Sequence, residues 1–420
     1  MIRRYILSAI GCMAMIVASG ANPTATTYST DDCQGSLKPY PTPASIVEYP
    51  DSLTPVMINH VGRHGARFPA SSSHSLQLLG VLQRADSAGT ITPTGRQLMK
   101  LTQYVIDKSD GQWGALDSLG MAEQRGIAAR MYTAYPELML QGPISALSSY
   151  SPRCVMSMYS FCHQLTRMNN RVEIIASSGR QYSDLMRPFD LDQDYLDFRK
   201  DNVWAPPYDE YMDATVPVSG LRRAIGDLPM SDHEAREMAL MEYYVLAGLS
   251  AMSINADLSQ YLTLDELNKL WSTFNLRQYL QRTATTVSSI PADIAAPLLN
   301  DLITTTSAVA EGRQGGKVLL RFGHAETLMP LLSLMRLPGC YYMTNYFDTV
   351  ALHWKDFDVV PLASNLQLIL FKAKKSGRYY LRVDLNERPI TLMPNSTTIY
   401  LPWGEARNYL TRCLPLYMQI

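Results

Sequence analysis

The sequence lacks the signals of several large classes of protein. After the first 21 residues, no segment is apolar over the roughly 18 residues that a membrane-spanning helix needs, so we expect no such helix there. No internal repeat or low-complexity tract is present. Hydrophobic residues make up 46% and charged residues 18% of the chain, as in ordinary globular proteins. This composition excludes a disordered, collagen-like or coiled-coil chain.

An excess of charge of one sign is also lacking. Lys and Arg total 37, Asp and Glu total 38, and the formal net charge is −1. Without an overall basic field, the chain is not expected to bind nucleic acid or an anionic membrane. An anionic ligand would instead need positive charge that is concentrated in a local pocket.

Three common catalytic or nucleotide-binding motifs are missing. Gly-x-Ser-x-Gly does not occur, which excludes the nucleophile elbow of serine hydrolases. The pair His233-Glu234 is followed by Glu237 in place of the second histidine of a zinc protease. The glycine-rich stretch before Lys317 has Glu311 where a P-loop has its first glycine.

The first residues are typical of a secretory signal peptide. Arg3 and Arg4 precede an apolar run over Tyr5–Ala18 that is too short to span a bilayer comfortably, and small residues follow it. This pattern predicts cleavage near Gly20–Asn22 and export to the periplasm or out of the cell. An uncleaved N-terminal anchor is the alternative interpretation.

Cysteine is scarce, with six residues in the 420-residue chain. No two of them form a Cys-x-x-Cys pair, so no structural zinc cluster is expected. Cys12 would leave with the signal peptide. The remaining five are an odd number, which leaves at least one cysteine unpaired in an exported protein.

The order of the predicted elements indicates an α/β fold, because strand–helix units at both ends flank a mainly helical middle part. We divide the chain into a signal peptide (1–21), the first part of an α/β core (22–169), an inserted mainly helical cap (170–310) and the second part of the core (311–420). The expected strands are Pro55–Val61, Ile144–Ser149, Val172–Ala176, Lys317–Phe322, and an antiparallel pair Leu366–Lys372 and Tyr379–Leu385. The expected helices are Ser73–Arg84, Thr94–Lys108, Ser118–Tyr132, Pro152–Met168, Asp232–Ser250, Thr263–Gln281, Pro291–Ala310 and Ala325–Met335.

One chemical motif lies where the first predicted strand ends, in Gly62-Arg63-His64-Gly65-Ala66-Arg67-Phe68-Pro69. The carboxyl ends of strands are where ligands bind in open α/β sheets. Arginine suits phosphate because its planar fork donates two parallel hydrogen bonds. His64, between Arg63 and Arg67, could attack a phosphorus atom that they hold, and Gly65 would let the backbone approach an anion closely.

A second motif, Gly323-His324-Ala325-Glu326, again lies between a strand and a helix. A helix N-terminus offers unpaired backbone N–H groups and the positive end of the helix dipole to an anion. Taken alone, Glu326 is an ordinary residue for a first helical turn. The pairing with the Arg-His-Gly motif gives the second motif its weight.

Together the two motifs resemble the histidine acid phosphatase branch of the histidine phosphatase superfamily. His-Ala-Glu, where most members have His-Asp, resembles the multiple inositol polyphosphate phosphatases, a phytase subgroup. The resemblance covers nearly all of the chain after the signal peptide. It includes Gly120–Glu123, Ser148–Ser157, Arg321–His324 and Pro361–Leu366.

The resemblance implies a phosphoglycerate-mutase-like α/β core, with a central sheet flanked by helices and an inserted mainly α-helical cap. It also implies a mechanism in which His64 attacks phosphorus and forms a phosphohistidine while Glu326 protonates the leaving group. Arg63, Arg67, Arg153 and His324 would bind the phosphate oxygens. No metal or other cofactor is implied, since arginine and histidine supply the positive charge.

The implied substrates are inositol polyphosphates, phytate foremost, and we expect a monomer that acts on them at mildly acidic pH. Positive charge would lower the pKa of His64, and substrate phosphate would raise the pKa of Glu326. Arg187 is the preferred contact for the further phosphates, ahead of Arg180, Arg222 and Arg223. Lys38 lies in a stretch, Gly35–Tyr40, that weakly resembles another binding segment of the family, shifted by one residue.

Three alternative functions stay open at this point. A broad-specificity acid phosphatase or sugar phosphatase would use the same chemistry on other substrates. A mutase-like phosphotransferase would share the nucleophile, although its substrates are cytosolic and the chain carries an export signal. A non-catalytic polyphosphate-binding protein would have no need of His64 or Glu326, and both are present.

Overall fold

The computed structural model describes residues 27–313 and 316–419. The signal peptide expected over residues 1–21 lies outside the described residues, so export stays a prediction. None of the helices in the described ranges is both long and apolar enough to cross a membrane.

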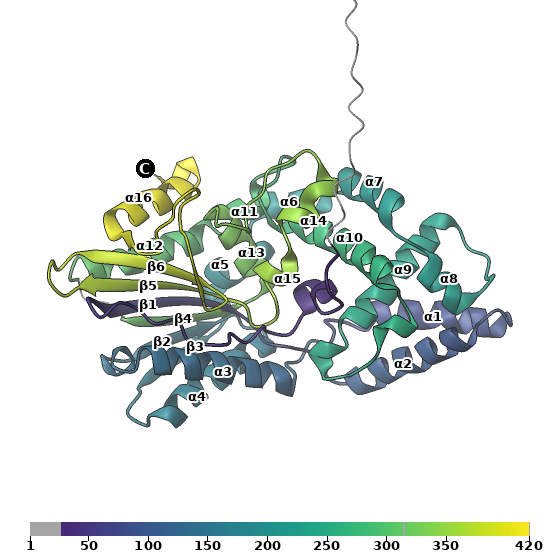
Figure 1. Cartoon of the computed structure of the whole chain (residues 1–420), viewed down its shortest axis with the longest axis horizontal. Helices are drawn as coiled ribbons and strands as arrows, with labels where there is room; N and C mark the ends of the chain where they lie inside the picture. The colour runs from purple at the N-terminus through teal and green to yellow at the C-terminus, as the bar shows by residue number, and fades with distance from the viewer. Residues whose placement is uncertain (1–26, 314–315, 420) are drawn as a thin grey trace, which may run out of the picture.

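Within these ranges, one mixed sheet of eight strands forms the centre of one side of the molecule, and a group of helices forms the other side (Figure 1). The strands are β1 (Leu53–Arg63), β2 (Ile144–Ser148), β3 (Ile174–Ser178), β4 (Val318–Gly323), β5 (Asn365–Ala373), β6 (Tyr379–Leu385), β7 (Arg388–Ile390) and β8 (Leu401–Pro402). They follow the order β3-β2-β4-β1-β5-β6-β7, and β8 pairs with β6. Strands β3, β2, β4 and β1 are parallel, whereas β5 to β8 pair antiparallel. The carboxyl ends of four parallel strands therefore share one edge.

Helices cover both faces of the sheet because its strands are apolar on both sides. In β1, Ile58 belongs to one buried cluster, while Met57 and Val61 belong to the other. Met57 and Val61 lie one and three residues away from Ile58, so they point to the opposite face of the strand. The first cluster is closed by α3 (Ser118–Ala134) and α4 (Pro152–Met168). The second is closed by α12 (Ala296–Ala310), α13 (Ala325–Leu334) and α16 (Trp403–Cys413).

A second group of helices packs beside the sheet (Figure 1). It comprises α1 (Ser73–Ser87), α2 (Pro93–Ser109), α7 (Ala205–Thr215), α8 (Ser219–Ile225), α9 (Asp232–Ala247) and α10 (Leu264–Arg282). Thus α1 and α2, from the first part of the chain, pack on the helices of the predicted cap. Conversely β3 and α12, from the segment 170–310, lie in or on the sheet. The division into sequence-contiguous domains stays a prediction.

The remaining elements are short. They are the helices α5 (Ser183–Met186), α6 (Gln193–Lys200), α11 (Ile290–Asp293), α14 (Val350–His353) and α15 (Asp356–Val359), and the 3₁₀ helices η1 (Asp32–Leu37), η2 (Leu138–Leu140), η3 (Arg180–Tyr182), η4 (Pro188–Asp190), η5 (Ser250–Met252), η6 (Leu258–Gln260), η7 (Phe347–Thr349) and η8 (Leu416–Met418).

The start of helix α2 differs by one residue from the sequence-based expectation. Helix α2 begins at Pro93 because the Thr92 hydroxyl, and not Thr94, caps it by accepting from the backbone N–H of Gly95. Helix α3 begins at Ser118, as expected, and the Asp117 carboxylate caps it by accepting from the backbone N–H of Leu119. Proline at the first helical position opens α4 as expected, since its missing N–H has no partner there anyway.

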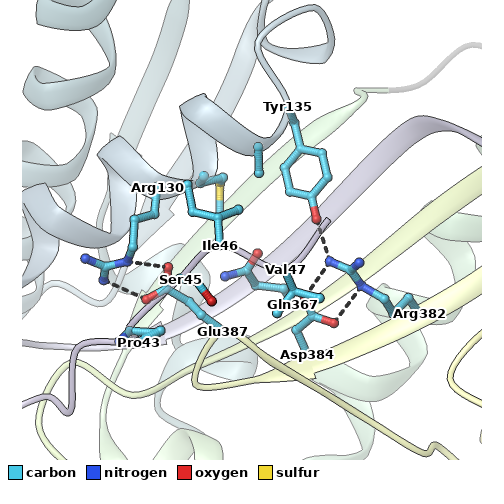
Figure 2. Close-up of a pocket in the computed structure, with 12 residues that line it drawn as sticks. Pro43, Ser45, Ile46, Val47, Arg130, Tyr135, Gln367, Arg382, Asp384 and Glu387 are labelled. Atoms are coloured by element: carbon cyan, nitrogen blue, oxygen red, sulfur yellow. Dashed lines mark hydrogen bonds and ion pairs between the residues drawn. The ribbon is translucent and has the colours of Figure 1, made fainter. Parts of the chain in front are cut away.

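The segment before β1 is irregular, as expected, but it is fastened to the sheet. The Tyr40 hydroxyl donates to Glu387 and accepts from Asn365 of β5. Farther along, Pro43–Val47 covers a small pocket in which Arg130 pairs with Glu387 (Figure 2). A second pair in this pocket, between Arg382 and the adjacent Asp384 of β6, is almost completely buried.

All five cysteines that the structure describes are unpaired. Cys33, Cys154, Cys340 and Cys413 are buried, and Cys162 is half-buried. The expectation of at least one unpaired thiol is confirmed, and the fold is held by its buried apolar clusters instead of disulfides.

Candidate active site

The loop that carries His64 leaves the carboxyl end of β1 and is held by α3. The Glu123 carboxylate accepts from the backbone N–H groups of Ala66 (2.7 Å) and Tyr40 (2.7 Å). Gln124 donates to the carbonyl of Arg63 at 2.9 Å, and the backbone N–H of His64 donates to Gly323 of β4. These bonds fix the loop from both sides, so His64 is held in one place.

Gly65 allows a close contact that the sequence did not predict, and its approach to an anion stays a prediction. A Cβ atom at this position would lie 2.4 Å from the carbonyl oxygen of Gly120, and one at Gly120 would lie 2.2 Å from that of Ala66. The close backbone approach is therefore between the loop and α3. Glycine at both positions lets Glu123, one turn farther along α3, reach the loop.

His64 is buried and neutral. Burial lowers its pKa well below the usual value, and the positive charges of Arg63, Arg67 and Arg153 lower it further. Its Nδ1 lies 2.9 Å from the carbonyl oxygen of Gly65, which can only accept a hydrogen bond. The proton therefore resides on Nδ1, and the lone pair on Nε2 is available as a nucleophile.

Three arginines surround this histidine with hydrogen-bond donors that the protein leaves unused. Arg63 is anchored through Nη1 to the carbonyls of Ser36 (2.6 Å) and Val360 (2.5 Å), and Arg67 through Nη1 to Phe68. The Nε atoms of Arg63, Arg67 and Arg153 are buried and have no partner among the described residues. Buried donors without partners are costly, so these positions suit an anion that accepts from them.

The second motif lies next to the first, and His324 is its residue beside His64. Its ring centroid lies 5.7 Å from that of His64. Nη2 of Arg153 lies 3.3 Å from its Nδ1, and Nη1 of Arg187 lies 2.8 Å from its Nε2. Burial lowers the pKa of His324 to about 3; the Glu326 carboxylate opposes this shift, and the two arginines reinforce it. A neutral His324 has a single acceptor nitrogen, so it accepts from one of the two arginines while both lie beside His64.

Glu326 lies in the first turn of α13, as the sequence predicted, and Arg282 contacts it. Nη2 of Arg282 is 2.9 Å from Oε1 of Glu326. Burial would raise the pKa of Glu326, but Arg282 and then His324 outweigh it and hold the pKa below its usual value. This direction is opposite to the one expected from a neighbouring phosphate.

Arg282 is the main residue that the sequence did not reveal. It lies in the last turn of α10, where a basic residue is common because it complements the helix dipole, so nothing marks it as functional. Its Nε is a further buried donor without a partner among the described residues.

The structure brings Arg187 into this cluster but not Lys38. Arg187 contacts His324 and also donates through Nε to Asp190 at 2.6 Å. The Lys38 ammonium pairs with Asp32 at 2.7 Å and lies over Phe357, away from the cluster. Its role in binding stays a prediction that no contact supports.

Of the other three arginines considered from the sequence, Arg180 lies over the ring of Tyr150 and the remaining two are engaged elsewhere. Arg222 donates to the carbonyl of Leu228, and Arg223 pairs with Glu266. Within the described ranges, no three His, Cys, Asp or Glu side chains are grouped as a metal site would need.

Comparisons with known proteins agree with the motifs. The chain is 24% identical over 380 residues to multiple inositol polyphosphate phosphatase 1 of Homo sapiens, across 83% of this chain and 77% of that protein. The chicken (Gallus gallus) protein of the same name is 24% identical over 386 residues, across 87% and 82% of the two chains. No family model matches the chain.

Solved structures share the fold. The Bifidobacterium longum multiple inositol polyphosphate phosphatase in complex with inositol hexasulfate matches with a TM-score of 0.79 and 17% identity, over 92% of this chain and 99% of that one. The phytase from D. castellii matches with a TM-score of 0.68 and 16% identity, over 94% and 88%. The chain is thus similar in sequence to the two multiple inositol polyphosphate phosphatases and shares the fold of the solved phosphatase and phytase structures. The expected α/β class, a central sheet flanked by helices, is confirmed.

Proposed function

We propose that this chain is a histidine acid phosphatase, an exported phosphoric monoester hydrolase that acts on inositol polyphosphates, phytate foremost. One observation carries the proposal. A neutral His64, with its Nε2 lone pair available, lies among arginines whose buried Nε donors have no partner within the described residues. Relatives named for inositol polyphosphate phosphatase activity support the reaction class.

The first step transfers the phosphoryl group to the protein. Nε2 of His64 bonds to phosphorus in line with the ester oxygen, whose bond to phosphorus breaks. The electron pair of that bond goes to the ester oxygen, which takes the proton of Glu326. Donors from Arg63, Arg67 and Arg153 stabilise the charge on the equatorial oxygens, which is where positioned donors contribute most.

The second step returns the protein to its starting state. Water attacks the phosphohistidine and gives a proton to the Glu326 carboxylate. The bond between phosphorus and nitrogen breaks, its electron pair returns to Nε2 of His64, and inorganic phosphate leaves. Glu326 is then protonated for the next substrate.

The charges around His64 and Glu326 favour activity at acidic pH. The lowered pKa of His64 keeps this nucleophile neutral in acid. Glu326 must carry a proton in the first step, and Arg282 opposes this in the site as it stands. A substrate phosphate that draws Arg282 toward itself and brings negative charge beside Glu326 would raise the pKa of that carboxyl again.

A broad-specificity acid phosphatase is the second candidate, because the phosphate-binding residues do not by themselves select the alcohol. Arg187, which contacts His324 beside the phosphate-binding arginines, favours a substrate with more than one phosphate.

The test compares the mature protein with His64→Ala in phosphate release from phytate, without added metal, from acidic to neutral pH. We expect release by the parent protein to fall by about three orders of magnitude or more in the variant, since the covalent route is lost. His163→Ala, which removes an exposed histidine of α4, is the control and keeps full activity.

The other outcomes separate the alternatives. Turnover of 4-nitrophenyl phosphate without turnover of phytate would move the protein to the broad-specificity class. Tight binding of phytate without turnover of either substrate would contradict the enzymatic proposal and leave a polyphosphate-binding protein.

A further inference from the structure

The guanidinium group of Arg63 is held by two backbone carbonyls that come from segments far apart in the chain. Nη1 of Arg63 donates to the carbonyl of Ser36 at 2.6 Å and to that of Val360 at 2.5 Å. Arg63 is buried, and its Nε has no partner among the described residues. The positions of these two carbonyls therefore determine where the unused donor of Arg63 points.

One buried residue, Asp356, places both carbonyls. Its Oδ2 accepts from the backbone N–H of Ser36 at 2.8 Å. Its own carbonyl accepts from the backbone N–H of Val360 at 2.9 Å, across the single turn of α15. A Cβ atom at Gly35 would lie 2.8 Å from Oδ2, so glycine at this position, with φ +58°, lets the carboxylate reach the N–H that follows. The side chain of Asp356 thus holds Ser36, and its backbone holds Val360.

Helix α10 fixes Asp356 in turn. Nε1 of Trp271 donates to Oδ1 of Asp356 at 3.0 Å, and Oδ1 of Asn275 accepts from the backbone N–H of Asp356 at 2.9 Å. Trp271 and Asn275 are both buried and lie one helical turn apart. The last turn of the same helix carries Arg282, the partner of Glu326. One helix therefore supports residues on both sides of the proposed reaction.

The charge of this carboxylate also acts on Arg63. Burial lowers the pKa of Arg63 to about 10, and Asp356 is among the groups that oppose this shift. Burial raises the pKa of Asp356 to about 6, against the hydrogen bonds from Trp271 and Ser36 and the charge of Arg63. The carboxylate therefore stabilises the charged guanidinium as well as the turn that holds it.

We propose that Asp356 is a positioning residue that aims Arg63 at the phosphate through the backbone of Gly35 and Ser36. The inference rests on the proposed function and deepens it, because Asp356 is completely buried and acts only through Arg63. Without the carboxylate, the Ser36 carbonyl is no longer fixed, and the reacting phosphate loses a donor that was oriented in advance. The segment that contains Lys38 thus contributes a backbone carbonyl to the site.

The experiment measures kcat and KM of Asp356→Ala on phytate and on 4-nitrophenyl phosphate at pH 7, above the pKa of Asp356. We expect kcat/KM to fall about tenfold or more on both substrates, since Arg63 serves the phosphate that reacts in each. Asp356→Asn keeps one acceptor oxygen and should recover part of the loss. Asp384→Ala is the matched control, because it removes another buried carboxylate, the partner of Arg382. Its folded protein should have the kcat/KM of the parent.

A double-mutant cycle separates positioning from a general loss of structure. In an Arg63→Gln background, Asp356→Ala should lower kcat/KM by less than about twofold, since the residue through which it acts is gone. Losses that multiply in the double variant would overturn the inference, and so would an Asp356→Ala protein as active as the parent. Asp356→Asn takes the place of the alanine variant in the cycle if the latter does not fold.

Binding distinguishes failure of this inference from failure of the proposed function. Calorimetry measures the dissociation constant of inorganic phosphate for the parent, Asp356→Ala and Asp384→Ala. Weaker binding in Asp356→Ala alone supports the positioning of Arg63, even if the parent protein hydrolyses neither substrate. Equal binding by all three proteins would overturn the inference, even if the parent hydrolyses both.

Discussion

At the scale of single residues, the contact between Arg282 and Glu326 controls the protonation of the proposed proton donor, Glu326. The two side chains approach to 2.9 Å, and the positive charges that face Glu326 are Arg282, His324 when protonated, and Arg63. Arg282 favours the ionised carboxylate, whereas donation of a proton needs the neutral acid. Arg282 is therefore a positioning residue that sets the proton affinity of Glu326.

Replacement of this arginine should move the pH profile. In Arg282→Gln the pKa of Glu326 rises, because the strongest opposing charge is gone and burial continues to raise it. The alkaline limb of kcat/KM, which requires protonated Glu326, should shift to higher pH by about one unit or more. Arg282→Lys keeps the charge and should leave the limb closer to that of the parent. A limb that stays in place in Arg282→Gln, or moves to lower pH, would contradict this role.

At the scale of elements, the site depends on how closely α3 approaches the loop after β1. Glu123 and Gln124 of α3 hold three backbone groups of the loop and its neighbourhood. Glu123 and Gln124 can reach the loop because Gly65 and Gly120 place no side chain between the backbone of the loop and that of α3. The packing of one helix therefore determines where His64 points.

A methyl group added at the contact between α3 and the loop should destabilise the fold and lower activity. Gly120→Ala places a Cβ atom within 2.2 Å of a backbone oxygen, which cannot move like a flexible side chain. We expect the free energy of unfolding to fall by about 2–4 kcal/mol and kcat to fall with it, as the loop is displaced. Denaturant unfolding and phosphate release measure the two effects.

Gly80→Ala is the control for this substitution. Gly80 lies inside α1, and a Cβ atom added there would have no neighbouring atom within 4 Å, so alanine should stabilise the helix by about 0.5–1 kcal/mol. Gly120→Ala with the stability of the parent protein would show that the helix and loop can separate without cost.

At the scale of the whole molecule, the helices beside the sheet contain a buried carboxyl with no role in the proposed reaction. Both oxygens of Glu242 in α9 lack hydrogen-bond partners among the described residues. Burial raises its pKa to about 8, against the smaller lowering effect of Arg223 and with a contribution from Glu266. Arg223 is already paired with Glu266 at 2.5 Å, so it does not neutralise Glu242. Folding therefore keeps this carboxyl protonated.

Stability should then depend on pH with a defined sign. The pKa of Glu242 is about 8 in the folded chain and 4.5 in the reference state, so the folded chain binds the extra proton between these values. The contribution is fully present below pH 4.5 and is lost as pH rises toward 8, at no more than about 1.4 kcal/mol per pH unit.

Glu242→Gln removes this slope, because glutamine does not titrate. Denaturant unfolding between pH 5 and 8 should show that the variant gains stability relative to the parent as pH rises. Glu210→Gln, at an exposed position of α7, should follow the parent at every pH. Parallel curves for Glu242→Gln and the parent would mean that Glu242 is ionised in the folded chain.

The sequence by itself determined the class of fold, and it indicated the residues proposed as nucleophile and proton donor. Periodic apolar runs with turn residues between them located the strands and the helix that Pro152 opens, because these signals are local. Arg63, His64, Arg67, His324 and Glu326 could be found because they lie in short motifs directly after β1 and β4, and strand ends are where α/β proteins bind ligands.

Only the tertiary structure decided which other charges join the site and which do not. Arg282 lies in a segment whose local sequence is ordinary, and Lys38 has an ion-pair partner, Asp32, that the sequence did not indicate. Whether a charged side chain is paired, buried or left without a partner depends on residues far away in the chain. The pKa of Glu326 also depends on distant residues, because the direction of its shift comes from the balance between burial and Arg282, which another helix supplies.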